Sequence, residues 1–238
     1  MLNFIGKGSA FNTELGNTSA FIKNDNSLLL IDCGGTVFNR LQELNILDGL
    51  ESIYIIITHM HPDHIGSLGE VIFYSHYVLK RKVNIIFPKK ELMSTFLTII
   101  GVKPEMYNLN SFNILYIRDR KLGEFTIEFI PVSHSSTMPS YGFIMKINGK
   151  AFYYSGDANI ISDKVIEKMK KGDLYRIYQD TCGLDYENNN HLSLKKLCDI
   201  ISQEFRDNIY CMHLDKHISE QEIRDNGFNV VEIYKHHS

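Results

Sequence analysis

Three histidines and an aspartate lie within the six-residue segment His59-Met60-His61-Pro62-Asp63-His64. Imidazole and carboxylate groups together bind borderline divalent metals such as zinc. The segment directly follows the apolar run 53–57, which predicts a buried strand. Because a strand that ends in such a cluster delivers several ligands to one point, we interpret the segment as a metal site. The alternative is a solvated polar turn after a buried strand.

Four more short motifs place an aspartate or a histidine after an apolar run. They are Asp32 before Cys33-Gly34-Gly35, His134 in Val132-Ser133-His134-Ser135, Asp157 in Tyr154-Ser155-Gly156-Asp157, and His213 after Ile209-Tyr210-Cys211-Met212. With the H-x-H-x-D-H pattern, this order of motifs resembles the metallo-β-lactamase superfamily. The resemblance covers residues 32–213, which is most of the chain.

The resemblance implies a ligand set for two divalent metal ions. The first ion would be held by His59, His61 and His134, the second by Asp63, His64 and His213, and Asp157 would bridge the two. Asp32 would bind no metal but would orient the loop that carries the ligands. Two ions held in this way would activate a bridging hydroxide, so Asp63 is also expected to be essential for catalysis. Zinc is the expected metal, and manganese and iron accept the same ligands.

A second pair of residues resembles the ribonuclease Z branch of phosphodiesterases. Asp180 follows an apolar run, and His191 precedes Leu192 and Ser193, which predicts a helix start. By this resemblance Asp180 would raise the basicity of His191, which would give a proton to the leaving oxygen or hold a phosphate oxygen. The branch more often has Glu at the first position and a His-Ser-Thr string at the second. The alternative for His191 is a surface histidine at a helix start.

The chain departs from ribonuclease Z where that enzyme carries its tRNA-binding arm. Only residues 135–156 separate His134 from Asp157, which leaves no room for such an arm. The compact length and the opening segment 8–20, after Gly6-Lys7, look similar to phage anti-Pycsar cyclic nucleotide phosphodiesterases. This resemblance implies hydrolysis of cyclic mononucleotides such as cCMP, cUMP, cAMP and cGMP to linear nucleotides, as a phage counter-defence.

Other functions remain open from the sequence. One alternative is an RNA nuclease without the arm, and another is a phosphodiesterase for a different small cyclic phosphate. A non-catalytic nucleotide sensor, a thiolesterase and a β-lactamase are also compatible with the fold, because fold does not fix function. Phe11, Tyr141 or Phe143 could stack on a base, but we expect all three in the core.

Composition limits the partners. The net charge is −3, and the basic clusters Lys80-Arg81-Lys82, Lys89-Lys90 and 168–171 predict solvated helix ends, so a long nucleic acid is not expected. No apolar run suits a membrane span. The first residues, 1–6, lack a basic region and a long apolar stretch, so we expect no signal peptide. The four scattered cysteines favour reduced thiols in a cytoplasmic protein, in the host cytoplasm if a phage encodes it.

Relatives in this branch form homodimers, so we expect this chain to form a homodimer as well. His76, His217, His236 and His237 match no motif and are interpreted as surface residues.

The elements that must position these residues alternate between strands and helices. Apolar runs predict strands near 2–5, 18–23, 27–32, 52–57, 83–87, 112–118, 124–132, 141–147, 150–155, 174–178, 208–212 and 228–233. Periodicity predicts helices over 36–47, 64–79, 89–100, 160–171, 193–204 and 217–225, with Ser162 or Asp163 and Ser193 as N-caps. We expect one domain, 1–238. Its fold class is α/β, and the resemblance implies a four-layer αββα sandwich.

Overall fold

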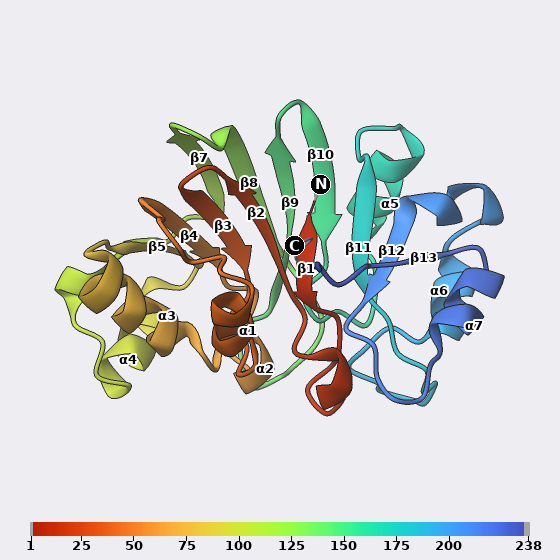
Figure 1. Ribbon diagram of the computed structural model, residues 1–238. Coiled ribbons are helices and arrows are strands. Elements are labelled where there is room, and N and C mark those ends of the chain that lie inside the picture. The colour runs from red at the N-terminus through yellow and green to blue at the C-terminus, as the bar shows by residue number, and fades with distance from the viewer. Residues whose placement is uncertain (1, 236–238) are drawn as a thin grey trace.

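Two β-sheets pack face to face, and helices cover the outer side of each (Figure 1). The computed structural model describes residues 2–235. Aromatic pairs join the sheets: the rings of Tyr54 and Phe125 lie 5.7 Å apart, and those of Phe4 and Tyr178 lie 5.5 Å apart. The layers are therefore helices, sheet, sheet and helices, which confirms the predicted αββα architecture.

The N-terminal half of the chain forms a six-stranded sheet, with the strands in chain order. The strands are β1 (Asn3–Gly6), β2 (Ser19–Asn24), β3 (Ser27–Ile31), β4 (Ser52–Ile56), β5 (Val83–Ile86) and β6 (Tyr107–Asn110). β1, β2 and β3 pair antiparallel, whereas β3 to β6 pair parallel. The sequence did not predict β6, because this short edge strand is half polar and carries little of the apolar signal that marks a strand.

The C-terminal half forms a seven-stranded sheet in the order β13-β12-β11-β10-β9-β8-β7. The strands are β7 (Ile114–Asp119), β8 (Gly123–Pro131), β9 (Tyr141–Ile147), β10 (Lys150–Tyr154), β11 (Arg176–Asp180), β12 (Ile209–Met212) and β13 (Asn229–Val230). The strands β7 to β10 pair antiparallel, and β10 to β13 pair parallel. Asn148 and Gly149 both have positive φ, as the predicted Asn-Gly hairpin turn between β9 and β10 requires.

Helices cover both outer faces (Figure 1). Those beside the first sheet are α1 (Val37–Glu43), α2 (Pro62–Ile65), α3 (Leu68–Tyr74) and α4 (Lys90–Ile99), and those beside the second are α5 (Asp163–Lys170), α6 (Leu194–Ile200) and α7 (Glu220–Asp225). Of the two predicted N-caps, the Ser193 hydroxyl accepts a hydrogen bond from the Lys196 N–H. Ser162 occupies the cap position of α5 without such a bond, and Asp163 is the first residue of the helix.

The single helix predicted over 64–79 was wrong. The chain forms α2, then α3, then a π-helical turn over Ser75–Leu79. The break falls at Ser67, whose hydroxyl donates to the Gly34 carbonyl at 2.6 Å and accepts from the Phe38 N–H at 3.1 Å. These tertiary bonds hold Ser67 outside helical geometry, and no local periodicity encodes them. The helix predicted over 193–204 likewise ends at Ile200, before a 3-10 turn over Gln203–Asn208.

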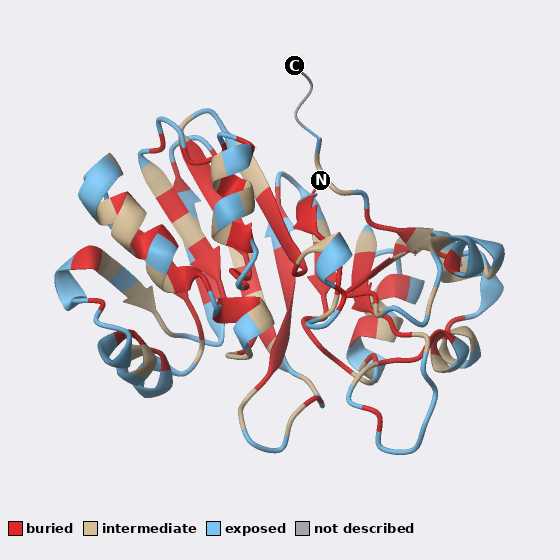
Figure 2. Ribbon diagram, turned by 60° about the horizontal axis from the view of Figure 1, so that its bottom comes forward, coloured by how far each residue is buried: buried red, intermediate tan, exposed pale blue. Residues whose placement is uncertain are grey.

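Alternating side chains of the second sheet fill two separate apolar clusters. Phe143, Met145 and Tyr154 join the larger cluster, which includes the first sheet and its helices. Their neighbours Ile144 and Tyr153 point to the other face and pack in the cluster beneath α5 to α7. Figure 2 shows the consequence, with strands mostly buried and helices buried along one side.

The parallel strands explain where the candidate residues meet. Asp32, His59, Asp157, Asp180 and His213 each lie at or just beyond the C-terminal end of β3, β4, β10, β11 or β12. Because parallel strands end at the same edge of their sheet, the sequence motifs are delivered to one edge of the sandwich. Figure 1 shows α2, which carries Asp63 and His64, at this lower edge. Among residues 2–235, no helix is long and apolar enough to cross a membrane.

The cysteines predict a simple pattern of thiol reactivity. Cys33, Cys182 and Cys211 are buried, and burial raises their thiol pKa to about 12, 11 and 12. Since the thiolate is the reactive form, these three should react slowly with a dithionitrobenzoate reagent, and half-buried Cys198 should react first. One fast thiol in the native protein, lost in Cys198→Ser, is expected. Any fast thiol in the native Cys198→Ser variant would contradict this packing.

Candidate metal centre

The seven residues of the expected ligand set converge in two groups that share one carboxylate. His59, His61, His134 and Asp157 form one group, and Asp63, His64, Asp157 and His213 form the other. Within each group the ligand atoms lie within 4.8 Å of one another. Asp157 belongs to both groups, which is the position expected of a bridging ligand.

Three ring nitrogens face one another in the first group. His61 Nδ1 lies 3.0 Å from His59 Nε2 and 3.0 Å from His134 Nε2. His134 Nδ1 donates to the Asn190 carbonyl at 3.2 Å, because a carbonyl oxygen only accepts. His134 therefore turns an unprotonated Nε2 toward the group. One proton on His61 Nδ1 can bond only one of its two neighbours well, whereas a metal ion can bind all three nitrogens, so this geometry fits a metal.

Two buried atoms of the second group lack hydrogen bonds. His64 Nε2 and Asp157 Oδ1 lie 3.1 Å apart, yet neither makes a hydrogen bond of good geometry among the described residues. Buried polar atoms are nearly always satisfied, and a metal ion would satisfy both. His213 Nε2 completes the group at 3.2 Å from Asp63 Oδ2.

Asp32 lies behind His64, as its predicted supporting role requires. Its Oδ2 is 2.8 Å from His64 Nδ1, and its Oδ1 accepts from the Thr58 N–H at 2.8 Å. The Thr58 hydroxyl donates to both carboxylate oxygens. The carboxylate thus holds the proton on His64 Nδ1 and turns Nε2 toward the site. Asp32 itself has φ of 57°, an uncommon conformation for a residue other than glycine.

Burial and neighbouring charges together set the protonation states of the side chains in the centre. Burial opposes ionisation of Asp157, but the imidazoles of His213 and His64 outweigh it and hold the pKa of Asp157 well below its usual range. Burial likewise opposes ionisation of Asp63, and hydrogen bonds from His213 and His64 lower its pKa below the ordinary value. Burial lowers the pKa of His59 and of His134, so these rings stay neutral and keep their lone pairs. Burial opposes protonation of His64 and His213, but the Asp157 carboxylate outweighs it and raises the pKa of His64 well above its usual range and that of His213 to about 10. The centre therefore combines ionised carboxylates with neutral rings at His59 and His134, and a divalent metal would displace the protons of His64 and His213.

Asp180 and His191 form the predicted pair. Asp180 Oδ2 lies 2.7 Å from His191 Nδ1 and also accepts from the Ala158 N–H at 3.1 Å. Asp180 Oδ1 faces His213 Nδ1 at 3.3 Å, without hydrogen-bond geometry. The His191 ring stacks on that of His213, with centroids 5.1 Å apart. One buried carboxylate therefore supports both a candidate ligand and a candidate proton donor.

Two glycines bring backbone segments close enough to build the centre. A Cβ on Gly34 would lie 1.9 Å from the Asp63 carbonyl oxygen, so only glycine allows this approach. Gly156 has φ of 57°, and a Cβ there would lie 2.7 Å from the Tyr141 carbonyl oxygen. Gly35 has no comparable constraint, since its nearest neighbour would be 3.8 Å away.

The centre lies in a cavity of about 770 Å³. Its wall includes residues that the sequence did not single out, among them Leu184, Tyr186, Asn189, Asn190, Asp215 and Lys216. These residues belong to no motif, and only the fold brings them to the metal groups. His217 is exposed, as predicted, but also lines this cavity.

The sequence interpretations of three aromatic residues and of the histidines outside any motif can now be compared with the structure. Phe11 was wrongly predicted to be a core residue, because its side chain is 88% exposed and lines the cavity. Tyr141 and Phe143 are buried as expected. His76 is half-buried against the Tyr77 ring rather than fully at the surface. His236 and His237 lie outside the described residues.

Comparison with known proteins identifies the family of this chain. The model of the family described as "Anti-Pycsar protein Apyc1" matches residues 1–237. The chain belongs to this family. A relative of the same name from Bacillus phage BSP38 is 31% identical over 233 residues, covering 89% of this chain and 88% of the relative.

Solved structures with this fold agree with the architecture. The metallo-β-lactamase fold protein YhfI from Bacillus subtilis superposes with a TM-score of 0.74 at 17% identity, covering 98% of this chain and 95% of YhfI. Human tRNase Z, short form, superposes with a TM-score of 0.68 at 16% identity, covering 98% of this chain and 97% of the enzyme. At these identities the likeness shows a shared metallo-β-lactamase fold.

The close approach at Gly34 predicts a position-specific effect. Gly34→Ala should displace the Asp63 backbone, lower the metal bound per chain and reduce Tm by about 5 °C, which corresponds to roughly 2 kcal/mol. Gly35→Ala is the matched control and should leave both values unchanged, because its Cβ meets no close atom. Elemental analysis and thermal denaturation measure the two effects. Equal behaviour of the two variants would show that Gly34 is not constrained.

The hydrogen bonds of Asp32 predict an effect on metal affinity. Asp32→Asn places an amide beside His64 Nδ1 and disturbs its tautomer, so metal affinity should fall about 10- to 100-fold. Competition with a chelator at equilibrium measures this affinity. Asp48→Asn, an exposed carboxylate on the same half of the chain, is the control. An Asp32→Asn variant that binds metal as tightly as the wild type would exclude the supporting role.

Proposed function

We propose that this protein is a metal-dependent phosphodiesterase that hydrolyses cyclic mononucleotides to linear nucleotides. The observation that carries the proposal is the Asp180–His191 pair directly beside the two ligand groups, in a chain of the anti-Pycsar family. His191 lies against both groups, with its ring centroid 5.1 Å from that of His134 and 5.1 Å from that of His213. A proton donor and a cation site within reach of the same substrate support phosphoester hydrolysis.

The ligand assignment follows the two groups. We assign His59, His61 and His134 to one ion, Asp63, His64 and His213 to a second, and Asp157 to both. Divalent ions held there, zinc or manganese, would supply Lewis-acid chemistry, activating water for attack on phosphorus and neutralising charge on the phosphate oxygens.

His191 is placed to hold a proton for the leaving oxygen. Burial lowers the pKa of His191, but the Asp180 carboxylate outweighs burial and raises the pKa above the ordinary value. Since Nδ1 is bonded to Asp180, the proton available to a substrate is the one on Nε2. The side chain is 28% exposed and lines the cavity, so a bound ester can reach it. Transfer of this proton would assist departure of the ribose oxygen.

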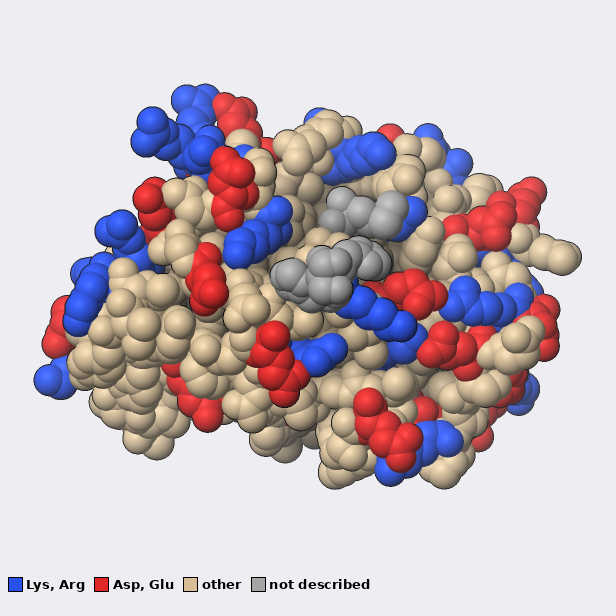
Figure 3. Space-filling model, in the orientation of Figure 1, with Lys and Arg blue, Asp and Glu red and all other residues tan. Residues whose placement is uncertain are grey.

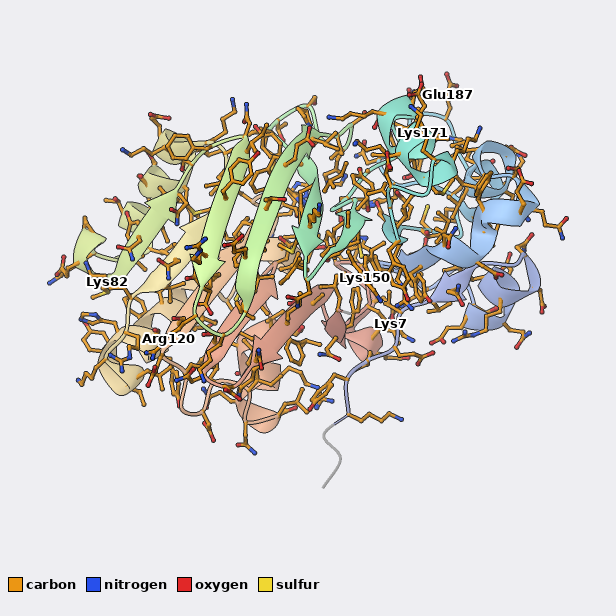
Figure 4. All side chains as sticks on the ribbon, turned by 90° about the horizontal axis from the view of Figure 1, so that it is seen from above. Lys7, Lys82, Arg120, Lys150, Lys171 and Glu187 are labelled. Carbon is orange, nitrogen blue, oxygen red and sulfur yellow. The ribbon has the colours of Figure 1, made fainter. Side chains whose placement is uncertain are left out.

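The cavity and the surface charge favour a small substrate. A volume of about 770 Å³ falls within the range of small-molecule sites. Lys82 and Arg120 lie on the left side of Figure 4, and Lys171 lies at its upper right. Figure 3 shows basic and acidic side chains interspersed on one face. The basic clusters 80–82, 89–90 and 168–171 all lie at helix ends, as predicted. This distribution offers no obvious track for a long nucleic acid on that face.

The family name gives the proposal its biological setting. A relative from a Bacillus phage is named an anti-Pycsar protein, so we propose that this chain serves phage counter-defence by removing cyclic nucleotide signals. The homodimer and the host-cytoplasm location expected from the sequence stay predictions.

Turnover of cyclic nucleotides by the metal-loaded protein tests the proposal. Cyclic mononucleotides should be converted to linear ones, and a chelator should stop the reaction until metal is restored. Asp63→Ala should lower kcat/KM by at least about 10³-fold because a ligand is lost, and His191→Ala by about 10²- to 10⁴-fold. Chromatography of the products measures both effects.

One control variant and two contrary outcomes belong to this test. His76→Ala removes a histidine outside the cavity and should retain full activity. Full activity of metal-free Asp63→Ala would refute the proposal. Inert cyclic nucleotides together with trimming of a tRNA precursor would instead establish the nuclease alternative.

A further inference from the structure

Phe11 exposes a large apolar ring at the edge of the metal cavity. Its side chain is 88% exposed, and the residue lines the cavity together with Ser9 and Ala10. A phenylalanine ring left in water forgoes the favourable burial of its apolar surface. An exposed ring beside a candidate active site is therefore a candidate contact for a ligand.

The backbone that carries Phe11 is fixed relative to the metal centre. Asn12 is buried, and its Nδ2 donates to the carbonyls of Leu214 at 3.0 Å and Asp215 at 3.2 Å. The Ser9 N–H donates to the Leu214 carbonyl at 3.0 Å. Leu214 directly follows the candidate ligand His213. The position of the Phe11 backbone is thus tied to that of a metal-site residue, which is the arrangement a preformed binding site needs.

A second aromatic ring borders the same cavity. Tyr186 is 55% exposed and lines the cavity beside Leu184. The segment is anchored from both ends: the Gly183 N–H donates to Asp215 Oδ1 at 3.2 Å, and Asn189 Nδ2 donates to the Leu184 carbonyl at 2.8 Å. The Phe11 and Tyr186 segments are therefore both bonded to residues 214–215.

Some hydrogen-bonding groups near these rings are already occupied. Asn12 Nδ2 is bonded to the backbone, Asn17 Oδ1 accepts from the Thr36 N–H at 3.0 Å, and Asn189 Oδ1 accepts from the His191 N–H at 3.1 Å. These three side-chain atoms already serve the fold and are not free to read the edge of a base. Ser9, Asn190 and Lys216 also line the cavity and can offer polar contacts, so the two rings would supply stacking beside them.

We propose that Phe11 and Tyr186 form a stacking site for the nucleobase, and that Phe11 determines how tightly nucleotide substrates bind. This inference rests on the proposed function, since it assigns a place to the base of a cyclic mononucleotide whose phosphate lies at the metal groups. Stacking of a base on an aromatic side chain stabilises binding and tolerates any base, because every base has a π face.

Steady-state kinetics of the metal-loaded protein test the inference. Phe11→Ala should raise KM for cyclic mononucleotides about tenfold, with kcat nearly unchanged. Phe11→Leu keeps apolar surface but lacks a π face and should resemble Phe11→Ala, whereas Phe11→Trp should restore the low KM. Tyr186→Ala should also raise KM. Phe112→Ala, which removes a ring that is 67% exposed outside the cavity, is the matched control.

A base-free probe separates stacking from a general disturbance. Cyclic ribose phosphate without a base should be turned over equally by the wild type and Phe11→Ala. An equal rise in KM for this probe and for the nucleotides would overturn the inference, and so would an unchanged nucleotide KM in both Phe11→Ala and Tyr186→Ala.

Binding of products distinguishes failure of this inference from failure of the proposed function. If the wild type hydrolyses no cyclic mononucleotide, the proposed activity is wrong, and calorimetry then compares AMP with ribose phosphate. Tighter binding of AMP, lost in Phe11→Ala, would still support a base-stacking site. Equal binding of the two compounds would reject it.

Discussion

The structure depends on one buried carboxylate that is surrounded by imidazoles. Asp157 is almost fully buried and lies within 4.0 Å of ring nitrogens from His59, His64, His134, His191 and His213. An isolated buried charge is costly, so the folded state must bring these rings together. The rings come from segments after β4, β8, β11 and β12. The need to compensate the buried charge of Asp157 therefore links both halves of the chain.

The two sheets meet this requirement because their parallel strands end at a shared edge. Strand geometry alone is not sufficient, since Asp32 and His213 both have left-handed backbone angles, with φ of 57° and 58°. Such conformations persist only where the surroundings enforce them. At Asp32 the enforcing contacts are hydrogen bonds from Thr58 and His64, and at His213 the next residue pairs with the N-terminal segment through Lys7. The centre is thus held by the fold before any substrate binds.

Support for the centre extends outward in layers. Asp32 orients His64, Asn190 orients His134, and Asp180 orients His191. Beyond them, Asn12 and Asn189 fix the segments that carry Phe11 and Tyr186. Lys7 is buried and pairs with Glu220, which attaches the N-terminal segment to the region after His213 (Figure 4 marks Lys7). Catalytic candidates and binding candidates therefore share one rigid framework.

The sequence by itself predicted the architecture and the candidate ligand set, because the order of its motifs resembles that of the metallo-β-lactamase superfamily. Apolar runs mark the strands, and the histidines and aspartates stand at their ends. Parallel pairing brings them to one edge of each sheet, and packing of the two sheets brings His59 and Asp157 together. Tertiary structure alone decided three other features. It divided the helix predicted over 64–79, through the bonds of Ser67. It formed β6 as an edge strand with little apolar signal. It also left Phe11 exposed beside the cavity, because the Asn12 bonds to residues 214–215 hold that segment at the rim, and a contact between residues some two hundred positions apart has no local signature.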